Sequence, residues 1–115
     1  MKLMVIILNK IEVLEHLLKQ LAEIGVSGAT IMPSTGMAKA LMDCNDYSFL
    51  NSLRVILDPD REESRTVFAI IDDELETPAM DCVEKEVGDL SNPNTAIVFT
   101  LPVLNIRGIN KKCDK

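Results

Sequence analysis

The sequence has few aromatic side chains: three phenylalanines, one tyrosine and no tryptophan in 115 residues. Bases of nucleic acids stack on aromatic rings, and a phosphate backbone is bound by clustered Lys and Arg. This chain has neither feature, because acidic residues outnumber basic ones and the net charge is −6. The composition therefore argues against a protein that binds nucleic acid.

Cysteine and histidine are also scarce. Cys44, Cys82 and Cys113 lie far apart and form no Cys-x-x-Cys pair, so the sequence predicts neither a zinc knuckle nor a redox pair. His16 has no second histidine or cysteine nearby, and its position in a predicted helix places it toward solvent. The sequence pairs no cysteine with a base, so we expect neither nucleophilic catalysis nor another enzymatic activity of this protein.

A long hydrophobic run is missing as well. The longest run near the start, residues 3–8 (LMVIIL), is far shorter than the roughly 20 residues that span a bilayer. No small-residue cleavage site follows it, and an odd number of cysteines fits poorly with a secreted disulfide framework. We therefore expect a cytoplasmic protein that is not embedded in a membrane, with a single domain over residues 1–115.

The sequence does contain apolar runs that alternate with amphipathic segments. The expected strands are residues 2–8, 28–34, 66–71 and 96–108, with Pro33 at an edge or an end and a bend at Pro102. One helix is expected between an N-terminal cap at Asn9 and the terminating Gly25. A second is expected between a cap at Thr77 and the terminating Gly88, with Pro78 as its first helical residue. The side chains of this second helix that should face the core are Met80, Val83 and Val87. A short helix is predicted over residues 49–57.

This order, with an insert at about residues 37–65, predicts an α+β fold. It is a ferredoxin-like βαββαβ sandwich, in which two helices cover one face of four antiparallel strands. A sheet with one face in water alternates apolar and polar residues, yet these strands are apolar on both sides. The second face would expose several hundred Å² of apolar surface, and another copy of the chain is the simplest cover.

Charged residues near the insert leave alternatives open. Lys39, Arg54, Arg61 and Arg65 could receive an anionic ligand or a partner's carboxylates, or they could be solvated among the neighbouring acids. The acidic residues 72–76 could bind a divalent cation, but we favour solvated charges at the start of a helix. Residues 28–41 (GATIMPSTGMAKAL) contain only Gly36 and Lys39 of a phosphate-loop pattern, so we expect a strand that runs into a loop.

Two long segments of the chain resemble the P-II nitrogen-regulatory superfamily, in its divergent P-II-like branch. Residues 1–36 are similar to that family's first strand, first helix and second strand, including its Gly-x-Thr and the glycine that follows. Residues 67–108 are similar to the third strand, second helix, connecting loop and last strand. The resemblance implies a homotrimer whose three sheets face inward, which agrees with strands that are apolar on both sides.

The resemblance also implies a function and a site. P-II proteins are non-catalytic sensors that bind adenine nucleotides or other small metabolites between subunits and regulate a transporter or an enzyme through the long loop, here residues 37–65. Gly36 matches the glycine that opens this loop, and Arg107 with Gly108 resembles the family's Arg-Gly ending. The candidate ligand residues are Gly36, Met37, Lys39, Asn92, Asn94, Thr95 and Arg107.

The chain departs from that family in two loops. Residues 88–96 (GDLSNPNTA) lack the Gly-x-Gly-Lys that brings amides and an ammonium to phosphates, and Asp89 adds charge of the wrong sign. Tyr47 cannot be equated with the tyrosine that is modified in the standard members. The first alternative is an interaction trimer without a small-molecule ligand. The second, which is less favoured, is an enzyme on the same fold.

Overall fold

The computed structural model describes residues 1–36, 64–92 and 95–108 of the chain. The four strands are β1 (Lys2–Leu8), β2 (Thr30–Ser34), β3 (Ser64–Ile71) and β4 (Ala96–Pro102). The α-helices are α1 (Leu14–Ile24) and α4 (Glu76–Val87), which follow 3-10 turns at Ile11–Val13 and Asp73–Leu75. The helix predicted over residues 49–57 lies outside the described residues. No helix among those described combines the length and apolarity needed to cross a membrane.

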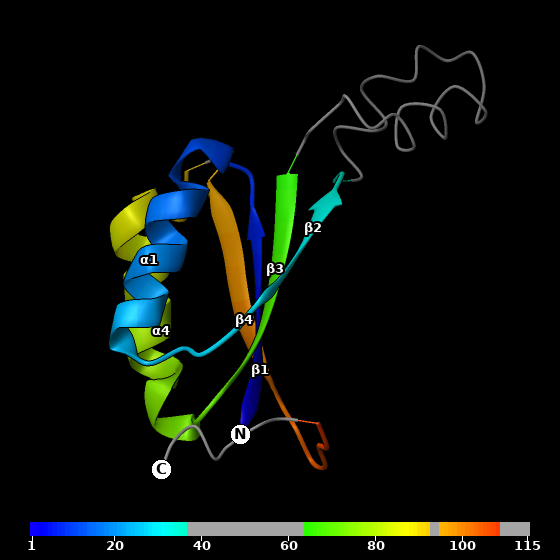
Figure 1. Ribbon diagram of the computed structural model, residues 1–115. Helices are drawn as coiled ribbons and strands as arrows, with labels where there is room; N and C mark the ends of the chain where they lie inside the picture. The colour runs from blue at the N-terminus through cyan, green and yellow to red at the C-terminus, as the bar shows by residue number, and fades with distance from the viewer. Residues whose placement is uncertain (37–63, 93–94, 109–115) are drawn as a thin grey trace, which may run out of the picture.

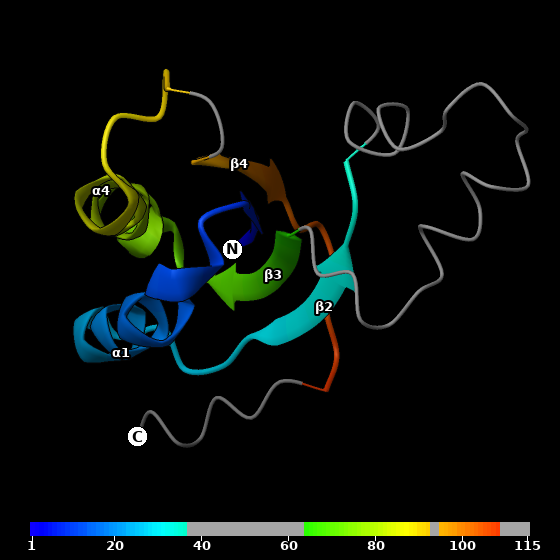
Figure 2. The same ribbon diagram turned by 90° about the horizontal axis from the view of Figure 1, so that it is seen from above.

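The strands form one antiparallel sheet in the order β2-β3-β1-β4. Both helices cover the same face of this sheet (Figure 1), and the view from above shows the resulting two layers (Figure 2). This is the ferredoxin-like α+β fold predicted from the sequence. β1 and β3 are central and β2 and β4 are edge strands, so Pro33 lies in an edge strand, where proline is tolerated.

The core lies between the sheet and the two helices. Met4 and Ile6 of β1 are fully buried, and they lie opposite Ala69 and Val67 of β3. The helices add side chains at helical spacing, which are Leu17 and Leu21 of α1 and Ala79, Val83 and Val87 of α4. Ala79 thus takes the buried position that was predicted for Met80, which is only half-buried.

Both helices end at the predicted glycines. Gly25 has a φ of +117°, and the N–H groups of Gly25 and Val26 donate to the carbonyl oxygens of Ala22 and Leu21. This arrangement satisfies the last carbonyl groups of α1, and it uses a backbone conformation that a Cβ atom would disfavour. Gly88, with a φ of +100°, ends α4.

The predicted helix starts were wrong. The Asn9 N–H donates to the Thr95 carbonyl oxygen at 2.8 Å, and a 3-10 turn then leads into α1 without a side-chain cap. Thr77 is not a cap either, because α4 begins one residue earlier, at Glu76. A 3-10 turn leads into α4, and in this turn the Leu75 N–H donates to the Asp72 carbonyl oxygen at 2.9 Å.

The last strand is shorter than predicted. β4 ends at Pro102, which lies opposite Lys2, the first residue of β1. The Val103 N–H still donates to the Met1 carbonyl oxygen at 3.1 Å, but β1 offers no further residues with which to pair. Residues 103–108 therefore leave the sheet, and the chain continues past its lower end in the view of Figure 1.

Candidate ligand-binding site

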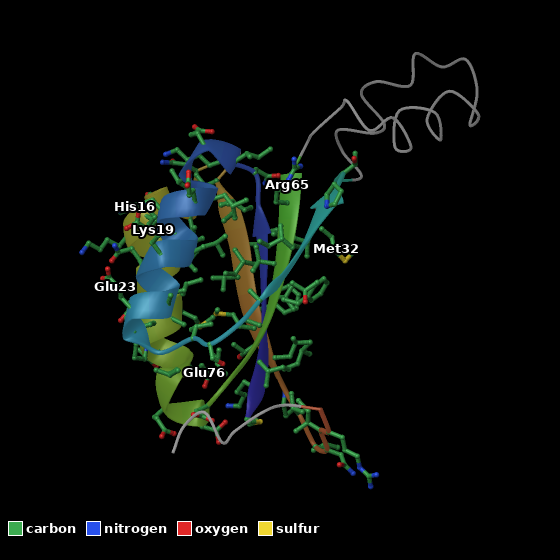
Figure 3. The ribbon with its side chains drawn as sticks, viewed as in Figure 1. His16, Lys19, Glu23, Met32, Arg65 and Glu76 are labelled. Atoms are coloured by element: carbon green, nitrogen blue, oxygen red, sulfur yellow. The ribbon has the colours of Figure 1, made fainter. Side chains whose placement is uncertain are left out.

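The face of the sheet that the helices leave uncovered, here called the open face, is apolar. The strand register places on it Leu3, Val5, Ile7, Met32, Phe68, Ile70, Ile97, Phe99 and Leu101. Ile97 is 57 % exposed, and Met32, which points away from the helices in Figure 3, is 45 % exposed. The prediction that both faces of the sheet are apolar is confirmed.

The loop between α4 and β4 lies at one end of the sheet and is tied to the residues that follow β1. The Thr95 carbonyl oxygen accepts hydrogen bonds from the N–H groups of Asn9 at 2.8 Å and Lys10 at 3.2 Å. The Thr95 hydroxyl donates to the Asn92 carbonyl oxygen at 2.9 Å, and Lys10 Nζ donates to the Val87 carbonyl oxygen at 3.1 Å. The backbone at Thr95 therefore has a fixed position at the start of β4.

Asp89 brings a negative charge to this loop. One carboxylate oxygen, Oδ1, accepts hydrogen bonds from the Ser91 N–H at 3.0 Å and from the Ser91 hydroxyl at 2.8 Å. These bonds, chiefly the one from the backbone, hold the pKa of Asp89 below its usual value. The loop therefore presents a carboxylate where a phosphate-binding loop would present donors.

A hydroxyl cluster that the sequence analysis missed lies at the same end of the sheet, where β2 meets β3. Ser34 Oγ and Ser64 Oγ are 2.7 Å apart, and Ser64 Oγ is 2.9 Å from the Ser34 carbonyl oxygen. Thr66 Oγ1 donates to Ser34 Oγ at 2.8 Å, so a chain of donors from Thr66 to Ser34 to Ser64 satisfies all three hydroxyls. The available signal was the pair Ser64 and Thr66, which lie two residues apart on β3 and so share one face of the sheet. The cluster fixes the end of β2 next to Gly36.

The described candidate residues do not form one site within a single chain. Gly36 follows β2, whereas Asn92 and Thr95 precede β4, so they lie at the same end of the sheet but at its opposite edges. β3 and β1 stand between them, a separation of about 14 Å for three strand spacings. Arg107 follows β4 and lies beyond the other end of the sheet. The remaining candidates, Met37, Lys39 and Asn94, lie outside the described residues.

The acidic residues after β3 are paired with cations at the start of β1. Asp73 Oδ1 lies 2.9 Å from the terminal nitrogen of Met1, and Glu76 accepts hydrogen bonds from Thr100 Oγ1 at 2.6 Å and from Lys2 Nζ at 3.1 Å. The terminal ammonium lowers the pKa of Asp73, and Thr100 followed by Lys2 lowers the pKa of Glu76. These pairs explain the acidic run as the anchored start of α4, and the described parts of the chain hold no group of metal-ligating side chains.

His16 and Cys82 belong to the helix layer. His16 is exposed on α1, and its Nδ1 lies 2.5 Å from Glu86 Oε1 of α4, so the contact joins the two helices. Cys82 is half-buried in α4, where burial first and the charge of Glu86 second raise the pKa of its thiol. A thiol held protonated is a poor nucleophile, which favours a packing role for this cysteine.

No protein-family model and no curated protein sequence matches this chain. The βαββαβ topology with strand order 2-3-1-4 is consistent with a ferredoxin-like or P-II-like fold. The assignment of the fold therefore rests on the strand order and the arrangement of the helices.

Proposed function

We propose that this protein is a cytoplasmic P-II-like signalling or sensor protein. It is a non-catalytic homotrimer that binds a small metabolite or nucleotide in clefts between subunits. Through the insert at residues 37–65 it regulates a partner, either a membrane transporter or an enzyme. The number of subunits and the kind of partner come from the resemblance of residues 1–36 and 67–108 to P-II-like chains.

The observation that carries this proposal is the position of Gly36 and Thr95. They lie at one end of the sheet but at opposite edges, so the two halves of a site meet only if edges of different copies come together. β2 and β4 run in opposite directions, so β2 of one copy can pair antiparallel with β4 of the next. A head-to-tail contact of this kind places Gly36 of one copy beside Thr95 of its neighbour, and it closes into a ring where the rotation between copies completes a circle.

The open face supports the same assembly. A ring of three sheets turns one face of each sheet inward, and the apolar residues of β1, β3 and β4 on that face then leave water. Patches of exposed apolar residues that adjoin one another are typical of interfaces between proteins. Self-association thus accounts for an apolar face that the helices leave uncovered.

A trimer that binds no small molecule is the second candidate, and Asp89 is the observation that favours it. Its carboxylate is held in place by Ser91 in the loop that would have to receive an anionic ligand. In that case the insert serves as a permanent docking surface for another protein.

Light scattering and a thermal-shift panel separate these candidates. The panel contains ATP, ADP, AMP, cyclic dinucleotides and bicarbonate. A ligand at about 100 times its dissociation constant adds about 2.7 kcal/mol to stability, which is easily measured. A trimer stabilised by one of these compounds supports the sensor, and a trimer that none of them stabilises supports the second candidate. A folded monomer at micromolar concentration contradicts both.

A further inference from the structure

The two edge strands of the sheet carry no charged side chain, since β2 reads TIMPS and β4 reads AIVFTLP. The large apolar side chains that the strands expose also lie on these two strands, and they are Ile31, Met32, Ile97, Phe99 and Leu101. Edge strands in water are usually protected by charged residues, because an apolar edge recruits another strand. Both edges of this sheet therefore have the composition of strands that are paired.

The backbone of β4 offers hydrogen-bonding groups on its outer side. The Val103 N–H donates to the Met1 carbonyl oxygen, so the odd-numbered residues of β4 bond to β1. Hydrogen-bonding groups alternate in direction along an antiparallel strand. The N–H and C=O groups of Ala96 and Val98 therefore point outward, where they have no partner among the described residues.

On β2 the outward groups belong to Ile31 and Pro33. Because the odd-numbered residues of β1 bond to β4, its even-numbered residues bond to β3, and the register then turns the even-numbered residues of β2 toward β3. Ile31 thus presents an N–H and a C=O at the edge, and Pro33 presents a C=O. Proline at this position removes one donor and leaves the edge able to pair.

A second copy of the chain can cover both edges at once. If β2 paired with β2 of another copy, every β4 would stay open, and pairing of β4 with β4 would leave every β2 open. A head-to-tail contact between β2 and β4 covers both edges of every copy in a closed ring. Two unprotected edges on one chain thus favour this contact over a two-fold dimer.

The strand levels show which residues meet at the contact. Met32 lies opposite Thr66, Thr66 lies opposite Ile7, and Ile7 lies opposite Ile97, so Met32 and Ile97 are level on the two edges. A rotation about an axis parallel to the strands leaves every residue at its level. It brings Met32 of one copy beside Ile97 of the next, and both side chains are exposed on the open face of the single chain.

From this geometry we infer that β2 and β4 of neighbouring copies form a continuous hydrogen-bonded ladder, with Met32 of one copy beside Ile97 of the next. In this register Ile31 faces Val98, and each presents an outward N–H and C=O to the other. The open faces of the two copies then join into one apolar surface. The inference rests on the proposed assembly and adds to it the register of the contact and the residues that form it.

A cysteine cross-link tests the register. Cys44, Cys82 and Cys113 are replaced by alanine, and the same chain then carries Met32→Cys and Ile97→Cys. Within one chain these positions lie on opposite edges, about 14 Å apart, which is too far for a disulfide. We expect oxidation to join different copies, and the largest product on a denaturing gel should contain as many chains as the ring.

The matched control combines Met32→Cys with Phe99→Cys, which lies on the same face of β4 but two residues farther along. Diagonal neighbours on paired strands lie about 7–8 Å apart, so this variant should give little cross-linked product. Variants with a single cysteine, Met32→Cys or Ile97→Cys, should give no covalent pair.

Hydrogen exchange of the wild-type protein gives a second, independent measurement. The amides of Ile31 and Val98 have no partner within the described part of a single chain, so a monomer should exchange them rapidly. In the ladder they are bonded and should exchange on the order of a hundredfold more slowly. Asn105, which is exposed and follows the last strand, is the reference and should exchange rapidly.

The outcomes distinguish this inference from the assembly on which it rests. An oligomer that exchanges Ile31 and Val98 rapidly, or that gives no product with Met32→Cys and Ile97→Cys, would overturn the inference and leave the proposed assembly standing. More product with Phe99→Cys would overturn the register. A covalent pair from a single-cysteine variant would show that like edges meet and would overturn the head-to-tail contact. A wild-type protein that is monomeric in light scattering would overturn both the inference and the assembly.

Discussion

Ile6 and Ile7 are consecutive residues of β1 whose side chains lie on opposite faces of the sheet. Ile6 is fully buried under the helices, whereas Ile7 lies on the open face, opposite Thr66. We predict that lysine affects the two positions differently. Ile6→Lys places a charge in the core and should lower the free energy of unfolding by about 4 kcal/mol or more. Ile7→Lys should leave the fold intact and separate the copies.

Circular dichroism melting curves and light scattering measure these two effects. Ile7→Leu serves as the control, because it keeps the open face apolar and should keep the assembly. An Ile7→Lys variant that remains oligomeric would show that the open face is not part of the interface.

The contacts of Glu76 predict a dependence of stability on pH. Its pKa is lowered in the folded chain, first by Thr100 and then by Lys2, so the carboxylate stabilises the fold above its unfolded pKa of about 4.3. This stabilisation is lost as the pH falls through the folded pKa. Glu76→Gln should therefore melt at a lower temperature than the wild type at pH 7, and the difference should shrink at pH 3.

Glu74→Gln is the matched control, because Glu74 lies in the same acidic segment but is exposed to solvent there. It should change the melting temperature little at pH 7. A difference between Glu76→Gln and the wild type that stays constant from pH 7 to pH 3 would contradict the assigned role of the carboxylate.

The fold could be predicted because its signals are local. The run of apolar residues in β1, the helical spacing of Leu14, Leu17 and Leu21, and the glycines that end both helices each define an element without any long-range information. The helix starts could not be predicted, because the Asn9 N–H is taken by Thr95, a residue far along the chain. The end of β4 depends in the same way on where β1 begins.

The candidate site was less predictable from the sequence. The pattern of residues marks Gly36 and Thr95 but does not reveal that two central strands separate them. The hydroxyl cluster at Ser34, Ser64 and Thr66 depends on the pairing of β2 with β3, whose register spans the insert. Such relations between distant segments appear only when the strands are placed side by side.

Two glycines should respond differently to alanine. Gly25 has a φ of +117°, a backbone conformation that a Cβ disfavours, so Gly25→Ala should cost about 1 kcal/mol of stability, although the added Cβ meets nothing closer than 3.5 Å. Gly36 has no such φ, and no atom of the described residues lies within 4 Å of an added Cβ. Gly36→Ala should therefore leave stability within about 0.5 kcal/mol of the wild type. Chemical denaturation measures both, and a large loss with Gly36→Ala would show that glycine is required within the single chain.

Nucleotide binding, if the thermal-shift panel detects it, should depend little on the number of phosphates. The loop at residues 88–92 presents the Asp89 carboxylate, which Ser91 holds in place, and it lacks the lysine and the second glycine of a phosphate-binding loop. Each missing charge-assisted bond costs about 1.5–3 kcal/mol. Calorimetry should therefore give a dissociation constant for ATP that is no lower than that for AMP.

Asp89→Asn tests whether this carboxylate is the cause. It removes a negative charge from the loop and should strengthen the binding of ATP more than that of AMP, because the repulsion grows with the charge of the ligand. Asp81→Asn makes the same change in net charge at an exposed position within α4 and should leave the ratio of the two dissociation constants unchanged. Tight, magnesium-dependent binding of ATP by the wild-type protein would contradict this account, since it would require phosphate donors that residues 88–92 do not provide.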